Sequence, residues 1–254
     1  MKIILFTQDD PFYLHDSLND LINKIQKTKK HKVVSAFISK ASPFGKSESF
    51  LKKIYKTYKI FGFNFFLFYS IKYFKNKFIF NKTVRKVFSK NNIPFFLLNE
   101  SINSINTEKK IKKYNADLIL IIAGNQIIKK NILNSTRFGV FNVHSSLLPN
   151  YRGLLPTFWV LKNNERFTGV TLYKLTEGID NGPIISQKKI SIEPNISHYD
   201  LINLLKIQAN NLFVKNLNTI SLNKTMKSPD GGSYYGFPKR KDVREFIKKN
   251  KNFF

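Results

Sequence analysis

Asn142 and His144, two residues apart, offer the clearest chemistry in the chain. They lie in the run Val140–His144, which is typical of a buried strand, and residues two apart in a strand point to the same face. A carboxamide and an imidazole side by side at the end of a strand can donate hydrogen bonds to a developing oxyanion. Taken alone, the pair is better explained by an asparagine that caps a loop and a histidine with satisfied hydrogen bonds.

The residues around this pair form a longer pattern. Residues 141–153 read Phe-Asn-Val-His-Ser-Ser-Leu-Leu-Pro-Asn-Tyr-Arg-Gly, residues 169–171 read Gly-Val-Thr, and residues 177–185 read Glu-Gly-Ile-Asp-Asn-Gly-Pro-Ile-Ile. In order and spacing, these strings resemble the signature of the formyltransferases that use 10-formyltetrahydrofolate. That family includes methionyl-tRNA formyltransferase, the glycinamide ribonucleotide enzyme of purine synthesis and nucleotide-sugar N-formyltransferases. The resemblance is dense from about residue 116 to residue 192 and looser elsewhere.

The resemblance implies a catalytic set of Asn142, His144 and Asp180. An acceptor amine would attack the formyl carbon of 10-formyltetrahydrofolate, while Asn142 and protonated His144 stabilise the tetrahedral oxyanion. Asp180 would orient or charge-balance His144, directly or through water, and help to remove the amine proton.

The resemblance also implies where the two substrates bind. The residues expected around the folate are Ile122, Ala123, Gly124, Gln126, Ile127, Ser146, Leu147, Leu148, Pro149, Glu177, Gly178 and Ile179. Simple packing explains Leu147 and Leu148 equally well. Tyr151, Arg152 and Gly153 are expected at the acceptor, where Arg152 either holds a phosphate or braces its loop. No metal is expected, because no His, Asp and Glu cluster has metal-ligand spacing.

Apolar runs and helical patterns alternate along the chain. They predict strands at 2–7, 32–39, 94–98, 117–123, 140–144, 168–175 and 183–192, and helices at 13–27, from 156 and from 198. This alternation predicts an α/β fold, a mostly parallel twisted sheet with helices on both faces, which is the Rossmann-like formyltransferase fold. Residues 1–222 are expected to form the catalytic domain, with a helical insertion at about 47–90, and 223–254 a C-terminal extension.

Several common classes of site are excluded or unsupported. The chain has no cysteine, so thiolate metal sites and a cysteine nucleophile are excluded, and it has neither G-x-G-x-x-G after the first strand nor a P-loop. The net charge of +27 comes from 37 lysines and only six arginines. It indicates either a polyanion partner or an AT-rich genome, and phosphate-binding proteins use more arginine. Likewise, the aromatic insertion predicts either helices packed on the domain or a surface for a membrane or partner.

The leading prediction of function is formyl transfer to a small amine, such as a nucleotide-linked amino sugar. The alternatives are methionyl-tRNA formylation, hydrolysis of formyltetrahydrofolate, and a non-catalytic protein that binds RNA or a membrane surface. Against the tRNA enzyme, the chain is too short for that enzyme's further C-terminal domain of about a hundred residues. No signal peptide or membrane span is predicted, so a cytoplasmic protein is expected, while the acceptor, the pathway and the oligomeric state stay open.

Overall fold

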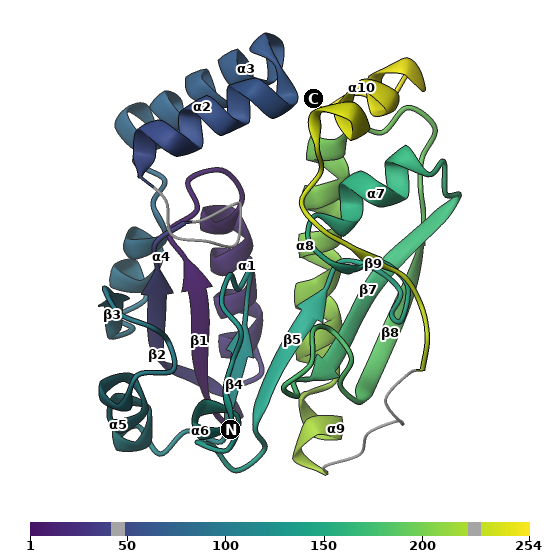
Figure 1. Ribbon diagram of the computed structural model, residues 1–254. Coiled ribbons are helices and arrows are strands. Elements are labelled where there is room, and N and C mark those ends of the chain that lie inside the picture. Colours follow the sequence, from purple (N-terminus) through teal and green to yellow (C-terminus); the bar gives the residue numbers. More distant parts are fainter. Residues whose placement is uncertain (42–48, 223–229) are drawn as a thin grey trace.

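The computed structural model describes residues 1–41, 49–222 and 230–254, and its centre is a twisted sheet (Figure 1). The strand order is β3-β2-β1-β4-β5-β7-β8. The first five strands are parallel to one another, β7 is antiparallel to β5, and β8 is antiparallel to β7. The strands are β1 (Lys2–Gln8), β2 (Lys32–Ser39), β3 (Phe95–Leu98), β4 (Leu118–Ile121), β5 (Val140–His144), β7 (Phe167–Lys174) and β8 (Ile184–Ser191). The predicted fold class is therefore confirmed, and the predicted strands are found to within a few residues.

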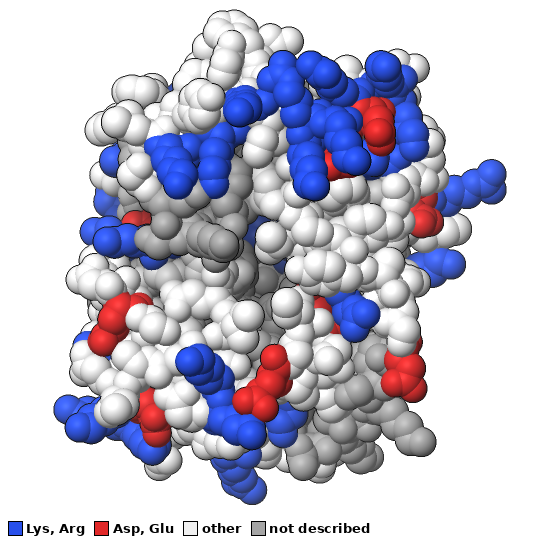
Figure 2. Space-filling view, viewed as in Figure 1, with Lys and Arg blue, Asp and Glu red and all other residues white. Residues whose placement is uncertain are grey.

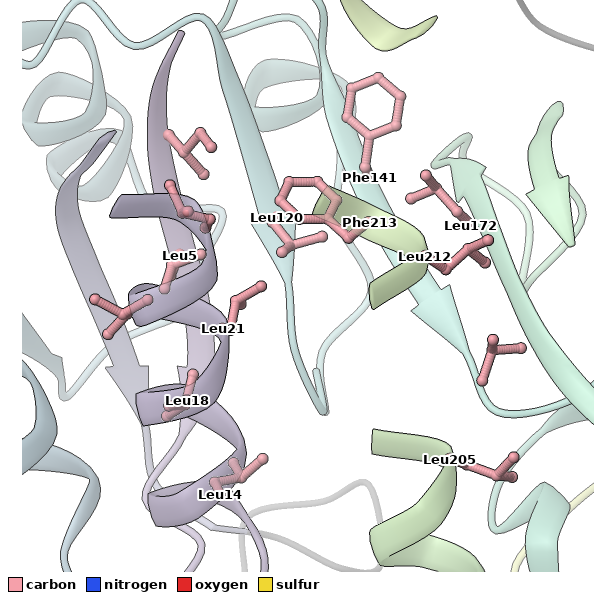
Figure 3. Packing of buried hydrophobic residues seen from close by; sticks show 14 of the residues in the cluster. Leu5, Leu14, Leu18, Leu21, Leu120, Phe141, Leu172, Leu205, Leu212 and Phe213 are labelled. Carbon is pink, nitrogen blue, oxygen red and sulfur yellow. The ribbon is translucent and has the colours of Figure 1, made fainter. Parts of the chain in front are cut away.

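Helices cover both faces of this sheet, which explains why the central strands are apolar throughout. In β1, Ile3 and Leu5 point into one buried cluster, and Ile4 and Phe6 into the other. The larger cluster is closed by α1 (Leu14–Lys27) and α8 (His198–Lys215), whose leucines meet the sheet in Figure 3. The smaller cluster is closed by α5 (Ile105–Lys113) and α6 (Lys130–Leu133).

The predicted insertion at about 47–90 is helical. It contains α2 (Phe50–Phe61), α3 (Phe63–Phe74) and the π-helical turn η1 (Lys75–Ile79). It ends with α4 (Val84–Lys90), which packs beside α1. Gly62, with φ of 87°, separates the first two helices. Residues 47 and 48, where the insertion was predicted to begin, lie outside the described residues. In Figure 1, α2 and α3 lie beyond the carboxyl ends of β1 and β2.

The C-terminal segment packs on the same core. After α9 (Leu217–Ser221) and the gap at 223–229, a two-residue strand β9 (Tyr234–Tyr235) pairs with β6 (Arg152–Gly153). Then α10 (Arg240–Lys248) packs on α2 and on α7 (Pro156–Lys162). Phe246 and Phe253 are buried in the larger cluster. The predicted domain boundary after residue 222 borders the gap and stays a prediction.

Candidate active site

Strand register brings the predicted pair beside two further polar side chains. The end of β5 pairs antiparallel with β7, so that Asn142 lies opposite Tyr173, and His144 lies opposite Thr171. Directly opposed residues in such a pair share one face of the sheet. Asn142, His144, Thr171 and Tyr173 therefore form one polar group at the carboxyl end of β5, between strands that are otherwise apolar.

A chain of polar contacts runs through this group to Asp180. The side-chain amide of Asn142 donates to the Tyr173 hydroxyl over 3.1 Å, and that hydroxyl donates to Oδ1 of Asp180 over 2.6 Å. Oδ2 of Asp180 lies 3.6 Å from Nδ1 of His144. The structure thus brings together the three side chains predicted to be catalytic, and Tyr173 links two of them.

The two ring nitrogens of His144 have different partners. Nε2 lies 2.7 Å from the carbonyl oxygen of Tyr151. A carbonyl oxygen can only accept, so Nε2 carries the hydrogen of this bond. Nδ1 then faces the Asp180 carboxylate. His144 and Asp180 are 7% and 13% exposed, so little water screens this pair.

The Tyr173 hydroxyl is held in its neutral form. Its burial, together with the neighbouring Asp180 carboxylate, raises the pKa of the hydroxyl well above the usual value. A neutral phenol keeps its hydrogen for the bond to Asp180 and a lone pair for the amide of Asn142. The Asn142 side chain therefore has a fixed orientation, with its nitrogen toward Tyr173.

Asp180 is positioned by its own backbone and by the loop across from it. Its φ of 48° is left-handed, a conformation that aspartate tolerates better than most residues. The backbone N–H of Gly153 donates to Oδ2 over 2.8 Å. Gly153 has φ of 96°, and a Cβ there would lie 2.3 Å from the carbonyl oxygen of Tyr235. The site therefore needs glycine where β6 passes β9.

Thr171 and Gln187 hold the loop that follows β5. The Thr171 hydroxyl donates to the carbonyl of Ser146 over 2.7 Å and accepts from the N–H of Leu148 over 3.1 Å. Gln187 on β8 donates to both the Leu148 carbonyl and the Thr171 hydroxyl. Ser146 is fully buried and donates to the carbonyl of Asn150, so its hydroxyl is used within the loop.

The residues predicted at the acceptor point in different directions. The Tyr151 ring stacks on Tyr235, and its hydroxyl donates to Glu165 over 2.6 Å. It therefore contacts the C-terminal segment. In contrast, Nε of Arg152 is buried and has no hydrogen-bond partner among the described residues. A buried guanidinium nitrogen without a partner is costly, and an anionic ligand would satisfy it.

The residues predicted at the folate fall into three groups. Ile122 and Ala123 pack against the larger cluster, while Gly124 and Gln126 line a small hollow at the carboxyl ends of β1, β2 and β4. Asn142, His144 and Asp180 are not among the lining residues of that hollow. In the loop after β5, Leu148 packs with Tyr173 and Ile184, Leu147 lies against Gly169, and Pro149 lies against Gly232. The remaining residues are exposed: Ile127, Glu177, Gly178 and Ile179.

Two of the loops predicted to enclose the folate are joined by charge. Lys130, which follows the loop after β4, has its ammonium 3.6 Å from the carboxylate of Glu177. The side chain of Asn125 ties the same loop to Gln8 and to the carbonyl of Lys40. The loops after β1, β2 and β4 thus meet at the carboxyl edge of the sheet, and the loop after the antiparallel strand β7 reaches the end of the β4 loop through Lys130. Ligands of open α/β sheets bind at this edge.

The sequence analysis gave no role in the site to Tyr173, Thr171 or Gln187. Tyr173 and Thr171 lie in a predicted strand, but their register against Asn142 and His144 comes from pairing that the sequence does not show. Within 1–41, 49–222 and 230–254, no group of three or more His, Cys, Asp and Glu side chains is arranged to hold a metal ion. Over the same residues, no helix is long and apolar enough to cross a membrane.

The sheet, with five parallel strands followed by β7 and β8, defines an α/β protein, and the Asn, His and Asp side chains beside the end of β5 form a group that can donate hydrogen bonds to an oxyanion. A family model described as formyl transferase matches residues 70–217, more than half of the chain, and the chain belongs to this family.

The curated relatives match this chain over only part of their own length. The methionyl-tRNA formyltransferase of Agathobacter rectalis is 38% identical over 110 residues, which cover 43% of this chain and 36% of the relative. That of Thermodesulfovibrio yellowstonii is 34% identical over 142 residues, 56% of this chain and 46% of the relative. The bifunctional polymyxin resistance protein ArnA of Wigglesworthia glossinidia brevipalpis is 36% identical over 160 residues, 62% and 24% of the two chains. The chain thus spans less than half the length of these relatives.

Solved structures of formyltransferases share the fold. Phosphoribosylglycinamide formyltransferase from Bacillus halodurans superposes with a TM-score of 0.61 at 18% identity, over 87% of this chain and 95% of that chain. An N-formyltransferase from Helicobacter canadensis, in complex with folinic acid and dTDP-3-aminofucose, gives 0.60 at 18% identity, over 100% and 84%. At these identities the likeness shows the Rossmann-like fold of the formyltransferases.

Proposed function

We propose that this protein transfers the formyl group of 10-formyltetrahydrofolate to the amine of an acceptor. The observation that carries the proposal is the continuous set of contacts from Asn142 through Tyr173 and Asp180 to His144, in a member of the formyl transferase family. A binding module has no need of a carboxamide, an imidazolium and a carboxylate fixed around one point. A transferase needs all three.

In this proposal, the acceptor nitrogen attacks the formyl carbon and a tetrahedral oxyanion forms. The amide nitrogen of Asn142 has two hydrogens, of which one goes to Tyr173 and the other donates to the oxyanion. His144 supplies the positive charge beside it, balanced by Asp180. The bond between the formyl carbon and N10 of the folate then breaks, N10 takes a proton, and the proton lost by the amine passes toward Asp180.

We propose that the donor binds between the loops after β4 and β7. Support comes from the ion pair of Lys130 with Glu177, which joins these two segments, and from the folinic acid in the Helicobacter canadensis neighbour. In this placement the residues at 122–127, 146–149 and 177–179 surround the folate. Backbone groups of these residues would pair with the pterin ring. The side-chain oxygen of Gln126 is already occupied, because it accepts from the N–H of Ile102.

For the acceptor we propose a small anionic amine, such as a nucleotide-linked amino sugar. Arg152 follows the loop held by His144, and its buried Nε lacks a partner among the residues described. A phosphate of the acceptor would supply one. The dTDP-3-aminofucose in the same neighbour is an amine of this class.

Formylation of initiator tRNA is the second candidate. Two observations favour it: curated relatives at 34–40% identity are methionyl-tRNA formyltransferases, and the chain carries a net charge of +27. Binding of tRNA through phosphates would weaken steeply as salt is raised.

The test is a turnover assay with purified protein and 10-formyltetrahydrofolate. Tetrahydrofolate release is followed with nucleotide-linked amino sugars, with charged initiator tRNA, and with no acceptor. We expect release with an amino sugar, and about a hundred- to thousand-fold slower release for Asn142→Ala, because one oxyanion donor is lost. Release with tRNA alone would move the acceptor to the second candidate, and equal release without any acceptor would indicate hydrolysis. No release under any condition would contradict formyl transfer.

A further inference from the structure

The outer face of α2, α3 and η1 carries an unusual density of exposed apolar side chains. Leu51 is 77% exposed, Phe63 60% and Phe78 64%. The other large apolar residues of this face that are exposed are Tyr55, Tyr58, Leu67, Ile71, Phe74, Ile79 and Phe80. Exposed apolar groups on this scale indicate a surface that meets a partner.

These side chains form stripes. On α2 the exposed residues are Leu51, Tyr55 and Tyr58, spaced by four and three. On α3 and η1 the exposed residues 63, 67, 71, 74 and 78 are spaced by four, four, three and four. Residues at these spacings lie on one side of a helix. Each helix therefore presents one apolar stripe outward.

The opposite side of the same helices is firmly packed, so the outward direction of the stripes is fixed. Phe65 packs edge-on against the buried Phe253, and Phe68 stacks on Phe254. The ammonium of Lys72 lies 3.7 Å from the centre of the Tyr199 ring. Asn76 donates to the carbonyl of Pro11 over 2.7 Å. The contacts that hold the insertion on the domain thus use a different set of residues from the stripes.

The charge of the same segment has one sign. Residues 49–80 contain seven lysines and no aspartate or glutamate. Lys52, Lys56 and Lys59 repeat the spacing of the α2 stripe one residue further on, so a cationic row borders the apolar one. Lys and Arg side chains gather over the upper part of the molecule in Figure 2, where α2 and α10 lie in Figure 1.

We propose that the outer face of α2, α3 and η1 docks on an anionic lipid bilayer. Apolar stripes enter the boundary between headgroups and acyl chains, while bordering lysines reach anionic headgroups with their stems along the apolar surface. Each helix has 12 residues, about 18 Å of rise, so both lie along the surface rather than across the bilayer.

Two other occupants fit the same face less well. RNA would neutralise the lysines but would gain nothing from covering Leu51, Leu67 and Ile71. A second copy joined by a two-fold axis would place the same lysine-rich segment against itself, with no acidic residue in 49–80 to balance it. Of these three occupants, a lipid surface alone uses the apolar and the cationic rows together.

The test is co-sedimentation of the full chain with phosphatidylcholine vesicles, with and without phosphatidylglycerol. We expect binding to the anionic vesicles at low salt, falling about fivefold for each lysine removed among Lys59, Lys75 and Lys77. The triple variant Leu67→Ser, Ile71→Ser and Phe74→Ser should bind at least about tenfold more weakly, because apolar area no longer enters the bilayer.

The matched control is Ile105→Ser, Ile207→Ser and Leu222→Ser, which removes three equally exposed apolar side chains elsewhere. It should bind vesicles as the unchanged chain does. Should the α3 triple variant melt at a lower temperature than this control, the single change Phe63→Ser replaces it. The proposal is overturned if the unchanged chain does not sediment with anionic vesicles. It is also overturned if the stripe variants bind vesicles as the unchanged chain does but bind tRNA, or form a dimer, more weakly.

Discussion

The hydroxyl of Tyr173 accepts from Asn142 and donates to Asp180, so it sets the orientation of two side chains that we propose act on the substrate. The hydroxyl is buried and adjacent to a carboxylate, both of which raise its pKa and keep it neutral. Tyr173 is thus a positioning residue: it acts through Asn142 and Asp180.

Replacing Tyr173 by Phe removes this link and keeps the ring. We expect kcat to fall by roughly ten- to a hundred-fold, the cost of two buried hydrogen bonds to reacting groups, while KM for the folate changes little. The control is Tyr234→Phe at an exposed tyrosine. A loss carried by KM, or a loss matched by a lower melting temperature, would argue against positioning.

His198 gives a second prediction for a single residue. It is the first residue of α8, fully buried, and burial lowers the pKa of its ring from the usual 6.5 to about 4. The unfolded chain then takes up a proton near pH 6.5, whereas the folded chain resists until about pH 4. The stabilisation is complete above pH 6.5, and roughly 3 kcal/mol of it is lost as pH falls to 4.

The measurement is the free energy of unfolding between pH 7 and pH 4 for the unchanged chain and for His198→Phe. The variant should lose less stability over this range. His15→Phe, at a histidine that is a quarter exposed, is the control and should change the slope far less. Parallel curves for the unchanged chain and His198→Phe would contradict the prediction.

The sequence indicated Asn142, His144 and Asp180 because their motifs resemble those of the family, and the structure places the three side chains in one group. Their chemical roles remain a proposal. Tyr173 escaped notice because its importance comes from a register between β5 and β7, which are 23 residues apart at their nearest ends. Such pairing depends on the whole fold rather than on a local pattern.

Among the elements, the pairing of β6 with β9 has the largest influence on the site. The N–H of Arg152 donates to the carbonyl of Ser233, and the N–H of Leu154 donates to the carbonyl of Tyr235. Trp159 stacks on Tyr235 from the other side. A segment near the C-terminal end of the chain therefore holds the loop that supplies partners to both His144 and Asp180.

Gly153→Ala tests this pairing. A Cβ at Gly153 would lie 2.3 Å from the carbonyl oxygen of Tyr235, so the strands must separate and the bond to Asp180 must lengthen. We expect activity to fall at least about tenfold and stability to fall by roughly 2–3 kcal/mol. Gly231→Ala is the control, because φ there is 69° and nothing lies within 4 Å of the added carbon. Equal effects of the two changes would mean that backbone strain alone is responsible.

Elements were predictable where the sequence pattern is strong. The apolar strands and the helices predicted at 13–27 and from 198 are confirmed, and the hydroxyl of Ser197 caps the second of these helices by accepting from the N–H of Asp200. The helix α5 was missed because it is polar and lysine-rich, with buried Thr107 and Ile111 as its only fully covered residues. The two-residue strands β6 and β9 were missed because they carry no period of their own.

For the whole molecule, the parallel pairing of β1 to β5 follows from the alternation of strand and helix patterns, which explains why the fold class was predictable. The meeting of the loops after β1, β2 and β4 also follows, because parallel strands end at the same edge. The details that decide the acceptor are set by side chains on irregular segments, where no pattern constrains them.

The net charge of +27 predicts a salt dependence of stability. Like charges repel more strongly in the folded chain, where they are closer together, than in the unfolded chain. Raising sodium chloride from about 10 mM to about 300 mM shortens the Debye length from about 30 Å to below 8 Å. We expect the melting temperature to rise by roughly 2–4 °C, measured by differential scanning calorimetry. A melting temperature that falls with salt would indicate that attractive ion pairs outweigh the repulsion.

The parallel pairing of residues 152–153 with residues 234–235 has a consequence for how the protein is made. A ribosome that has released the chain as far as residue 222 has already delivered all seven strands of the main sheet, together with Asn142, His144 and Asp180. The turn beside His144 still lacks the neighbour that shapes it. During synthesis the sheet can therefore assemble before residues 234–235 leave the ribosome, and the turn beside His144 takes its shape only after they have done so.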